Sequence, residues 1–154
     1  KWLLKIILKN QRPEFGTGFL EDETIIKYFT MNFKQTLLTS GVLGFLAVAL
    51  GAFGAHALKP TLLANNRLDV FELAVQYQFY HTFALLAIAL LLRKQESRLL
   101  KTAGVLMVVG TVLFSGSLYS MAITNTSSLG MITPLGGVCF LGGWGCLIVS
   151  ALRD

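Results

Sequence analysis

The sequence predicts an all-α integral membrane protein, a bundle of four transmembrane helices in contact with the lipid bilayer. After Met31 the chain has four long apolar stretches, and a helix of roughly 20 residues crosses a hydrocarbon core of about 30 Å. Charged residues make up 14% of the chain, against about 25% in soluble domains, and the mean hydropathy is +0.64. A helix also satisfies every backbone hydrogen bond within its own segment, as lipid requires. The four predicted spans are Thr36–Leu58, Leu68–Leu92, Leu99–Ala122 and Leu129–Leu152.

The charge distribution predicts an orientation with both termini in the cytoplasm. The loop Arg93–Arg98 (RKQESR), followed by Lys101, is the most basic of the loops, and short basic loops stay cytoplasmic. The uncharged loop Ile123–Gly130 then lies outside. The net charge of +5 is explained by basic residues at span ends, where they contact anionic head groups. No nucleic-acid-binding motif accompanies them, so nucleic acid is not an expected partner.

Residues 1–30 differ from the rest of the chain. Lys5 and Lys9 recur at helical spacing between apolar residues, which is compatible with an amphipathic helix on the membrane surface. The alternative, which we favour, is a non-native leader, because Met31-Asn32-Phe33-Lys34 resembles a natural start before a first span. Residues 31–154 are then the four-span membrane domain.

Prolines and asparagines mark the loops between the predicted spans. We expect Pro60 to end the first span, because the residue before a proline is pushed out of the α region. Asn65 and Asn66 favour a turn before the second span. Pro134 lies early in the fourth span, where it is tolerated in the first turn but kinks the helix if it lies deeper. The sequence leaves these two alternatives open.

Small residues predict where the helices pack. Helices in lipid associate through close backbone approach at small side chains, and such residues recur every three, four or seven positions in three of the four spans. The alternative is that the glycines line a narrow pore. The predicted packing residues are Gly44, Ala47, Gly51, Ala55, Gly110, Gly136 and Gly143.

Polar residues inside the spans predict a functional cluster, because ionisable groups are costly in a membrane. Glu72, Gln76 and Tyr80 repeat every four residues and so share one face of the second span. We expect this face to point into the bundle. Counting along the helices places the polar residues in the outer half of the membrane. The predicted cluster comprises His56, Glu72, Gln76, Tyr77, Tyr80, His81, Ser115, Ser117, Tyr119, Thr133 and Pro134.

Three interpretations of this cluster remain open. It is a hydrogen-bonded network that fixes helix register, a proton or solute pathway through Glu72 and His81, or a metal or haem site on His56 and His81. The two histidines differ in depth by about 8–14 Å on the helical rise, too far for axial haem ligands. Zinc needs more ligands than two histidines, and Cys139 and Cys146 lie in the other half. We therefore expect no metal and no cofactor.

Four ordered motifs carry a family resemblance. They are GAFGAHAL at 51–58, QYQ at 76–78 with His81, FSGSLY at 114–119, and TPLGG at 133–137 followed by Gly143-Trp144. From Met31 onward the chain resembles the domain of unknown function 423 family, which is related to the transmembrane protein 256 family. The resemblance implies a four-helix protein of the bacterial cytoplasmic (inner) membrane, with no assigned activity. It implies a shared site of His56, Gln76, Tyr77, His81, Ser115, Ser117, Tyr119 and Pro134.

The functional prediction follows from these observations. Common enzyme signatures such as G-x-S-x-G, H-E-x-x-H and the Walker loop are absent from the sequence. We therefore expect a non-enzymatic membrane component with a polar cluster in its outer half. The alternative is a small proton, ion or solute transporter or a channel subunit. So small a chain would need to form a homo-oligomer to enclose a pathway.

Overall fold

The computed structural model describes residues 31–153, and the two hypotheses for residues 1–30 lie outside this range. Four long helices follow one another, and they are α3 (Phe33–Ala55), α5 (Leu68–Lys94), α6 (Arg98–Thr124) and α7 (Thr133–Ala151). Short elements occupy two loops, the helix α4 (Lys59–Ala64) and the 3-10 helix η1 (Ser127–Met131). Each long helix is long and apolar enough to cross a membrane, with η1 continuing into α7. Within residues 31–153 there is no strand, so the all-α, four-span prediction is confirmed.

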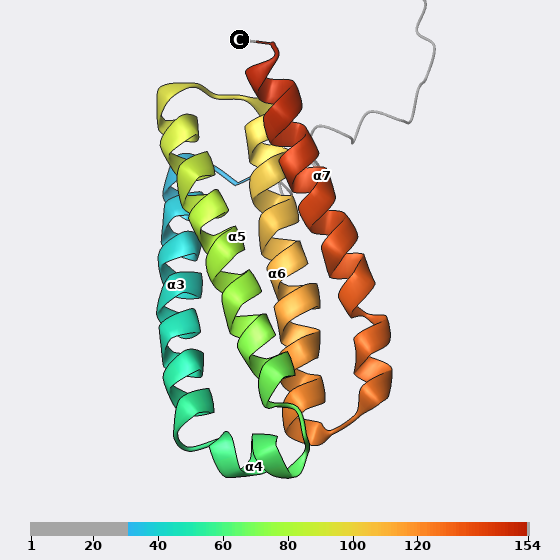
Figure 1. The fold of residues 1–154 in the computed structure, drawn as a ribbon. Helices are drawn as coiled ribbons and strands as arrows, with labels where there is room; N and C mark the ends of the chain where they lie inside the picture. Colours follow the sequence, from blue (N-terminus) through green and yellow to red (C-terminus); the bar gives the residue numbers. More distant parts are fainter. Residues whose placement is uncertain (1–30, 154) are drawn as a thin grey trace, which may run out of the picture.

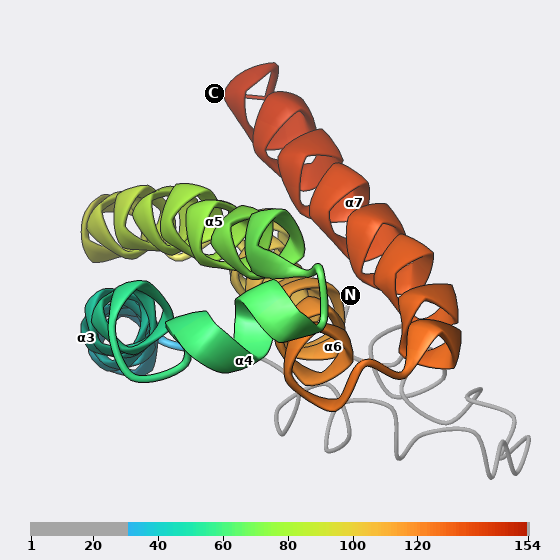
Figure 2. The same cartoon turned by 60° about the horizontal axis from the view of Figure 1, so that its bottom comes forward.

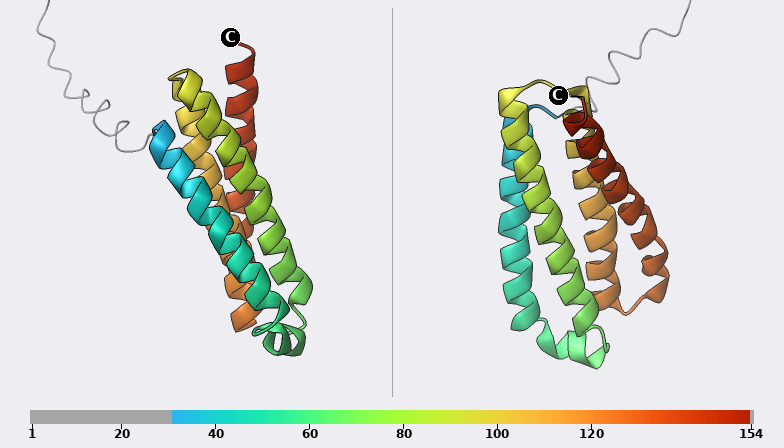
Figure 3. Two further views of the ribbon diagram at one scale, coloured as in Figure 1. Left: turned by 90° about the vertical axis from the view of Figure 1, so that its left-hand side faces the viewer. Right: turned by 45° about the horizontal axis from the view of Figure 1, so that its top comes forward.

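The helices run alternately up and down, and each packs along its neighbour in the chain (Figure 1). α3 packs on α5, α5 on α6, and α6 on α7. α3, α5 and α6 surround a common interior, with α4 beneath them at one end (Figures 2 and 3). α7 lies against α6 and diverges from α3 and α5, so the four helices do not close into a square (Figure 2).

The first span begins and ends earlier than the hydropathy pattern predicts. Asn32 and Gln35 form a reciprocal capping box, in which each side chain accepts the other's backbone N–H at 3.0 Å. α3 then ends at Ala55, and Lys59–Ala64 form the separate helix α4. Pro60 therefore does not end the first span but lies in the first turn of α4. Proline suits that position because the N–H it lacks would have no helical partner there.

Two asparagines shape the connection between α4 and α5, and one of them also bonds to α6. Asn66 adopts a left-handed conformation with φ of 54°, which asparagine tolerates better than most residues. The side-chain amide of Asn65 donates to the carbonyls of Ala122 and Ile123, both at 3.0 Å. These carbonyls belong to the last turn of α6, where no backbone donor follows. The loop before α5 thus caps the end of α6.

α6 and α7 approach each other most closely, at glycines. A Cβ added to Gly136 would lie 2.5 Å from the backbone nitrogen of Phe114 and 2.9 Å from the carbonyl oxygen of Gly110. A Cβ on Gly110 would meet the Phe140 ring at 2.6 Å, and one on Gly143 would meet Met107 at 3.0 Å. Backbones this close leave no room for a side chain between the helices.

The remaining predicted packing residues lie between α3 and α5, with one exception. Ala47 is fully buried, and Gly44 and Gly51 face Thr82 and Val75 at ordinary contact distance. Ala55 is exposed at the end of α3. Ala55 is the last residue of α3, where the chain leaves the helix, so its side chain is not enclosed between α3 and α5 as the four-residue spacing suggests. Pro134 lies in the first turn of α7, the tolerated alternative.

Candidate functional site

The structure does not gather the predicted polar cluster into one place. It divides most of the residues among three groups, in the α3–α5–α6 interior, in the space between α5 and α7, and on the outer surface of the helices. Ser117 and Thr133 form a separate pair between α6 and α7. The first group contains Ser115 and Tyr119. Gln78 and Thr82, which are not in the predicted cluster, also belong to this group.

Gln78 is the centre of the interior group. Its side-chain amide donates to the Leu43 carbonyl of α3 at 2.8 Å, and its Oε1 accepts the Tyr119 hydroxyl of α6 at 2.9 Å. Only 4% of Gln78 is exposed. One side chain thus joins three helices, and each of its bonds runs between helices rather than within one. Hydrogen bonds of this kind fix the position of each helix along its axis and its rotation about that axis.

Gln78 is not part of the predicted cluster, because the four-residue repeat of Glu72, Gln76 and Tyr80 marks the adjacent face of the helix as the polar one. A second signal was present in the sequence. Gln78 lies one turn from Ala74 and from Thr82, and these small residues are typical of a face where another helix approaches closely.

The second group lines an open groove between α5 and α7, which we call the α5–α7 groove. Its volume is about 470 Å³. The ring of His81 stacks on Phe140 with centroids 3.3 Å apart and planes at 8°, and Tyr77 stacks on Phe114 at 4.5 Å. The groove is lined by Tyr77, His81, Phe114, Pro134, Gly137, Val138, Phe140, Leu141 and Trp144.

Among the residues that line this groove, His81 is the one whose side chain is best suited to bind a ligand or to exchange a proton. Its Nδ1 lies 2.8 Å from the Tyr77 carbonyl, and a carbonyl only accepts, so Nδ1 donates. In the neutral ring, Nε2 then carries a lone pair and acts as an acceptor. Among residues 31–153 no hydrogen-bond partner for Nε2 is present. His81 is the central residue of the 27-residue helix α5, so its ring lies near the middle of that helix's length.

Ser117 and Thr133 form a separate link between α6 and the start of α7. Their hydroxyl oxygens are 2.8 Å apart. Ser117 also donates to the Phe114 carbonyl of its own helix at 2.9 Å, so Thr133 is the donor in the link. This bond fixes the end of α7 that is nearest the Gly110–Gly136 contact.

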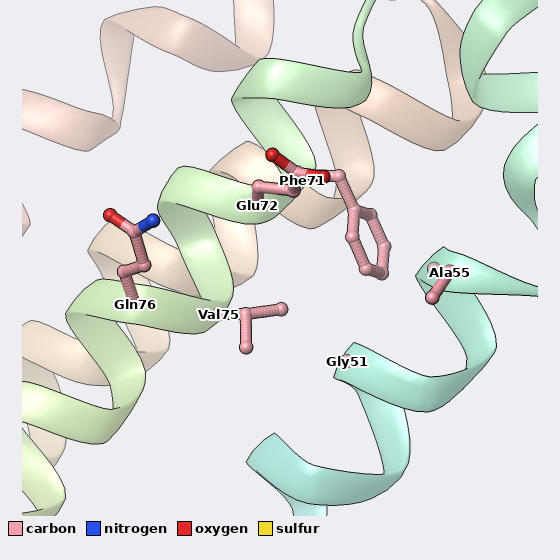
Figure 4. Close-up of a pocket in the computed structure, with 7 residues that line it drawn as sticks. Gly51, Ala55, Phe71, Glu72, Val75 and Gln76 are labelled. Carbon is pink, nitrogen blue, oxygen red and sulfur yellow. The ribbon is translucent and has the colours of Figure 1, made fainter.

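The third group lies on the outside of the molecule, contrary to the expectation that the Glu72–Gln76–Tyr80 face points inward. His56, Glu72 and Gln76 are exposed, and 59% of Tyr80 is exposed. In Figure 4, Phe71 and Val75 point from α5 toward α3, whereas Gln76 points away from it. α5 instead buries Ala74, Gln78 and His81.

The physical reason lies in depth and in side-chain size. Glu72 is one turn from the start of α5, near enough to the interface for its carboxylate to reach water without entering the bundle. It borders a shallow hollow of about 220 Å³ between α3 and α5. The interior face is left to the small residues, which allow α6 to approach.

His56 and His81 do not come together. His56 is the exposed C-cap of α3, and His81 is buried at the middle of α5. Within the described part of the chain, no group of three or more His, Cys, Asp or Glu side chains is placed to hold a metal ion.

Comparison with known proteins gives a consistent family assignment. A family described as "Protein of unknown function (DUF423)" matches residues 50–137. The UPF0382 inner membrane protein YgdD of Escherichia coli (strain K12) is 39% identical over 123 residues, which are 80% of this chain and 93% of the relative. The UPF0382 membrane protein YwdK of Bacillus subtilis (strain 168) is 43% identical over 121 residues, 78% of this chain and 98% of the relative. No solved structure matches.

Proposed function

This chain belongs to the DUF423 family and is a multi-pass inner-membrane protein, and we propose that it is a non-enzymatic membrane component that binds a lipid-soluble molecule in the α5–α7 groove. The observation that carries the proposal is His81, whose Nε2 acceptor lies beside a groove of about 470 Å³ near the middle of α5. His81 also bonds to its own helix through Nδ1, but its second ring nitrogen, Nε2, has no hydrogen-bond partner among residues 31–153.

The depth of the groove indicates how a ligand reaches it. α5 is about 40 Å long at 1.5 Å per residue, longer than the hydrocarbon core of about 30 Å. A groove at its centre therefore faces acyl chains and not water. A ligand that enters from the side must partition into lipid, which excludes charged metabolites from the class we propose.

The lining indicates the ligand's chemistry. Three of the aromatic rings that line the groove pack together: Tyr77 stacks on Phe114, and Phe114 packs against Phe140 at an angle of 51°. Such aromatic faces favour flat rings or chains over branched polar groups. Nε2 of His81 accepts a hydrogen bond, so the ligand carries a hydroxyl donor. We therefore propose an apolar molecule with a single hydroxyl group, of which a long-chain phenol is the simplest example.

Fluorescence quenching in liposomes tests this proposal. Trp144 lines the groove, and the chain has two tryptophans, so Trp2→Phe leaves Trp144 as the single reporter. The probes are an alkylated bromophenol and its methyl ether, which lacks the hydroxyl donor. We expect saturable quenching by the phenol, and an affinity about fivefold weaker for the ether and for His81→Phe, the value of one hydrogen bond of about 1 kcal/mol.

Tyr80→Phe is the matched control, because Tyr80 neighbours His81 in sequence but is exposed. It should leave the affinity unchanged. Quenching that rises in proportion to the amount of probe in the lipid, with the same slope in wild type and His81→Phe, would show simple partitioning and would overturn the proposal.

Transport is the second candidate, supported by the position of a buried histidine at the centre of α5. Proton and ion flux into liposomes loaded with a pH-sensitive dye tests it. The transport hypothesis requires flux in wild type that His81→Ala abolishes. Glu72→Gln is the informative partner, because Glu72 is exposed near one end of α5 and contributes only if the pathway runs along the outer surface.

A further inference from the structure

Two hydroxyl groups in the α3–α5–α6 interior have no hydrogen-bond partner among the described residues. They are Thr82 Oγ1 on α5 and Ser115 Oγ on α6. Thr82 is 6% exposed and Ser115 is 1% exposed, so neither residue is open to the outside of the bundle. A buried polar group without a partner costs free energy, and such groups are rare in native structures.

These two hydroxyls also differ from three other hydroxyls in the described helices. Thr36, Thr111 and Ser120 each donate to the backbone carbonyl one turn earlier in their own helix, at 2.8–2.9 Å. That bond is the usual solution for serine and threonine in a membrane helix. Thr82 and Ser115 do not make it, so both hydroxyls are available to another partner.

The Gln78–Tyr119 hydrogen bond indicates that the two hydroxyls lie at the same level of the bundle. α5 and α6 are antiparallel neighbours (Figure 1). Thr82 lies one turn after Gln78 and Ser115 one turn before Tyr119, so both lie one turn to the same side of the bond. The methyl group of Thr82 occupies the α3 side, 3.5 Å from a Cβ built on Gly44.

We propose that water binds inside the bundle at Thr82 and Ser115, as a site separate from the α5–α7 groove. A buried water makes about three hydrogen bonds to groups that otherwise lack partners. The two hydroxyls supply two of them. Gln78 Oε1, which accepts one bond from Tyr119, retains a second lone pair for the third. The interior network then extends from Leu43 through Gln78 to both hydroxyls.

A double-mutant cycle with Thr82→Val and Ser115→Ala tests the site in the full chain in detergent. If water joins the hydroxyls, each substitution lowers the Tm, by about 3 °C, and the double variant falls no further than the worse single variant. If the hydroxyls are unpaired, replacing each by an apolar group leaves the Tm unchanged or raises it, and the proposal is wrong. Thr36→Val with Ser115→Ala is the control pair, and its effects should add.

Radiolytic hydroxyl labelling separates bound water from a direct Thr82–Ser115 hydrogen bond, since both would couple the two substitutions. X-ray pulses convert bound water to hydroxyl radicals that oxidise neighbouring side chains. We expect oxidation of Tyr119 in wild type and a several-fold decrease in the Thr82→Val/Ser115→Ala variant. Coupled substitutions without Tyr119 oxidation in wild type would show a direct bond and would overturn the water site.

Discussion

The α3–α5–α6 interior and the α6–α7 contact are held together by different chemistry, although α6 takes part in both. In the interior, Gln78 bonds to Tyr119 and to the Leu43 carbonyl, so the helices are joined by long polar side chains. At the α6–α7 contact, the backbone of Gly136 lies directly against the backbone of α6 at Gly110 and Phe114. Polar bonds fix the register of α3, α5 and α6, whereas glycines set the distance between α6 and α7.

Because of this difference, the two regions tolerate different kinds of substitution. Lipid supplies little hydrophobic driving force for helix association, so each contact depends on packing or on hydrogen bonds. A contact built on backbone proximity fails when any atom is added. A contact built on hydrogen bonds fails when a partner is removed, and by a smaller amount, because bonds between membrane helices average about 0.6 kcal/mol.

The largest effect is expected at Gly136. In Gly136→Ala the new Cβ meets the backbone of Phe114 at 2.5 Å, and a backbone cannot rotate away as a side chain can. We expect a loss of stability of about 1–3 kcal/mol, the usual range for overpacking, measured by thermal unfolding in detergent.

Gly137→Ala is the matched control, because nothing lies within 4 Å of its added Cβ. Alanine favours a helix over glycine by up to about 1 kcal/mol, so this variant should be as stable as wild type or more stable. Equal losses in both variants would show that the α6–α7 contact is not set by backbone proximity.

The next effect is expected at Gln78. Gln78→Leu removes two inter-helix bonds and leaves the Tyr119 hydroxyl without a partner, so we expect a loss of about 1 kcal/mol by the same measurement. Gln76→Leu is the control on the same helix, since Gln76 is exposed, and it should leave stability unchanged. A larger loss of stability in Gln76→Leu than in Gln78→Leu would instead support the prediction that the Glu72–Gln76–Tyr80 face points into the bundle.

The contrast between Gln76 and Gln78 shows where sequence analysis was sufficient. Apolar length and charge alone predicted four helices, because lipid permits few other spanning structures. Small residues indicated Gly110 and Gly136 as helix contacts, and the structure places both there. The rotation of α5 was not predictable, because Glu72 can reach the interface and so does not force its face inward. The cytoplasmic position of the termini stays a prediction, since packing within the bundle carries no information about sides of the membrane.

A smaller effect is expected at Ser117, whose hydroxyl lies 2.8 Å from that of Thr133. Ser117→Ala removes one link between α6 and α7 and should cost about 0.6 kcal/mol. The glycine contact nearby should hold the helices in place. Ser120→Ala is the control, because Ser120 is exposed and bonds only to its own helix. A loss at Ser117 as large as that at Gly136 would mean that α7, too, depends on polar bonds.

The smallest effect on stability is expected at His81. A substitution there distinguishes a residue that binds a ligand in the groove from one that holds the helices together. In His81→Phe the ring that stacks on Phe140 is kept, and the lost Nδ1 bond ran only to the helix's own backbone. We therefore expect a change below about 0.5 kcal/mol, as for substitutions that break no link between elements, together with weaker binding of the bromophenol probe. His81→Ala removes the ring and should cost more, because it enlarges the groove beside Phe140. If His81→Phe were as destabilising as Gln78→Leu, His81 would belong to the structural network, and the groove would lose the residue that distinguishes it as a site.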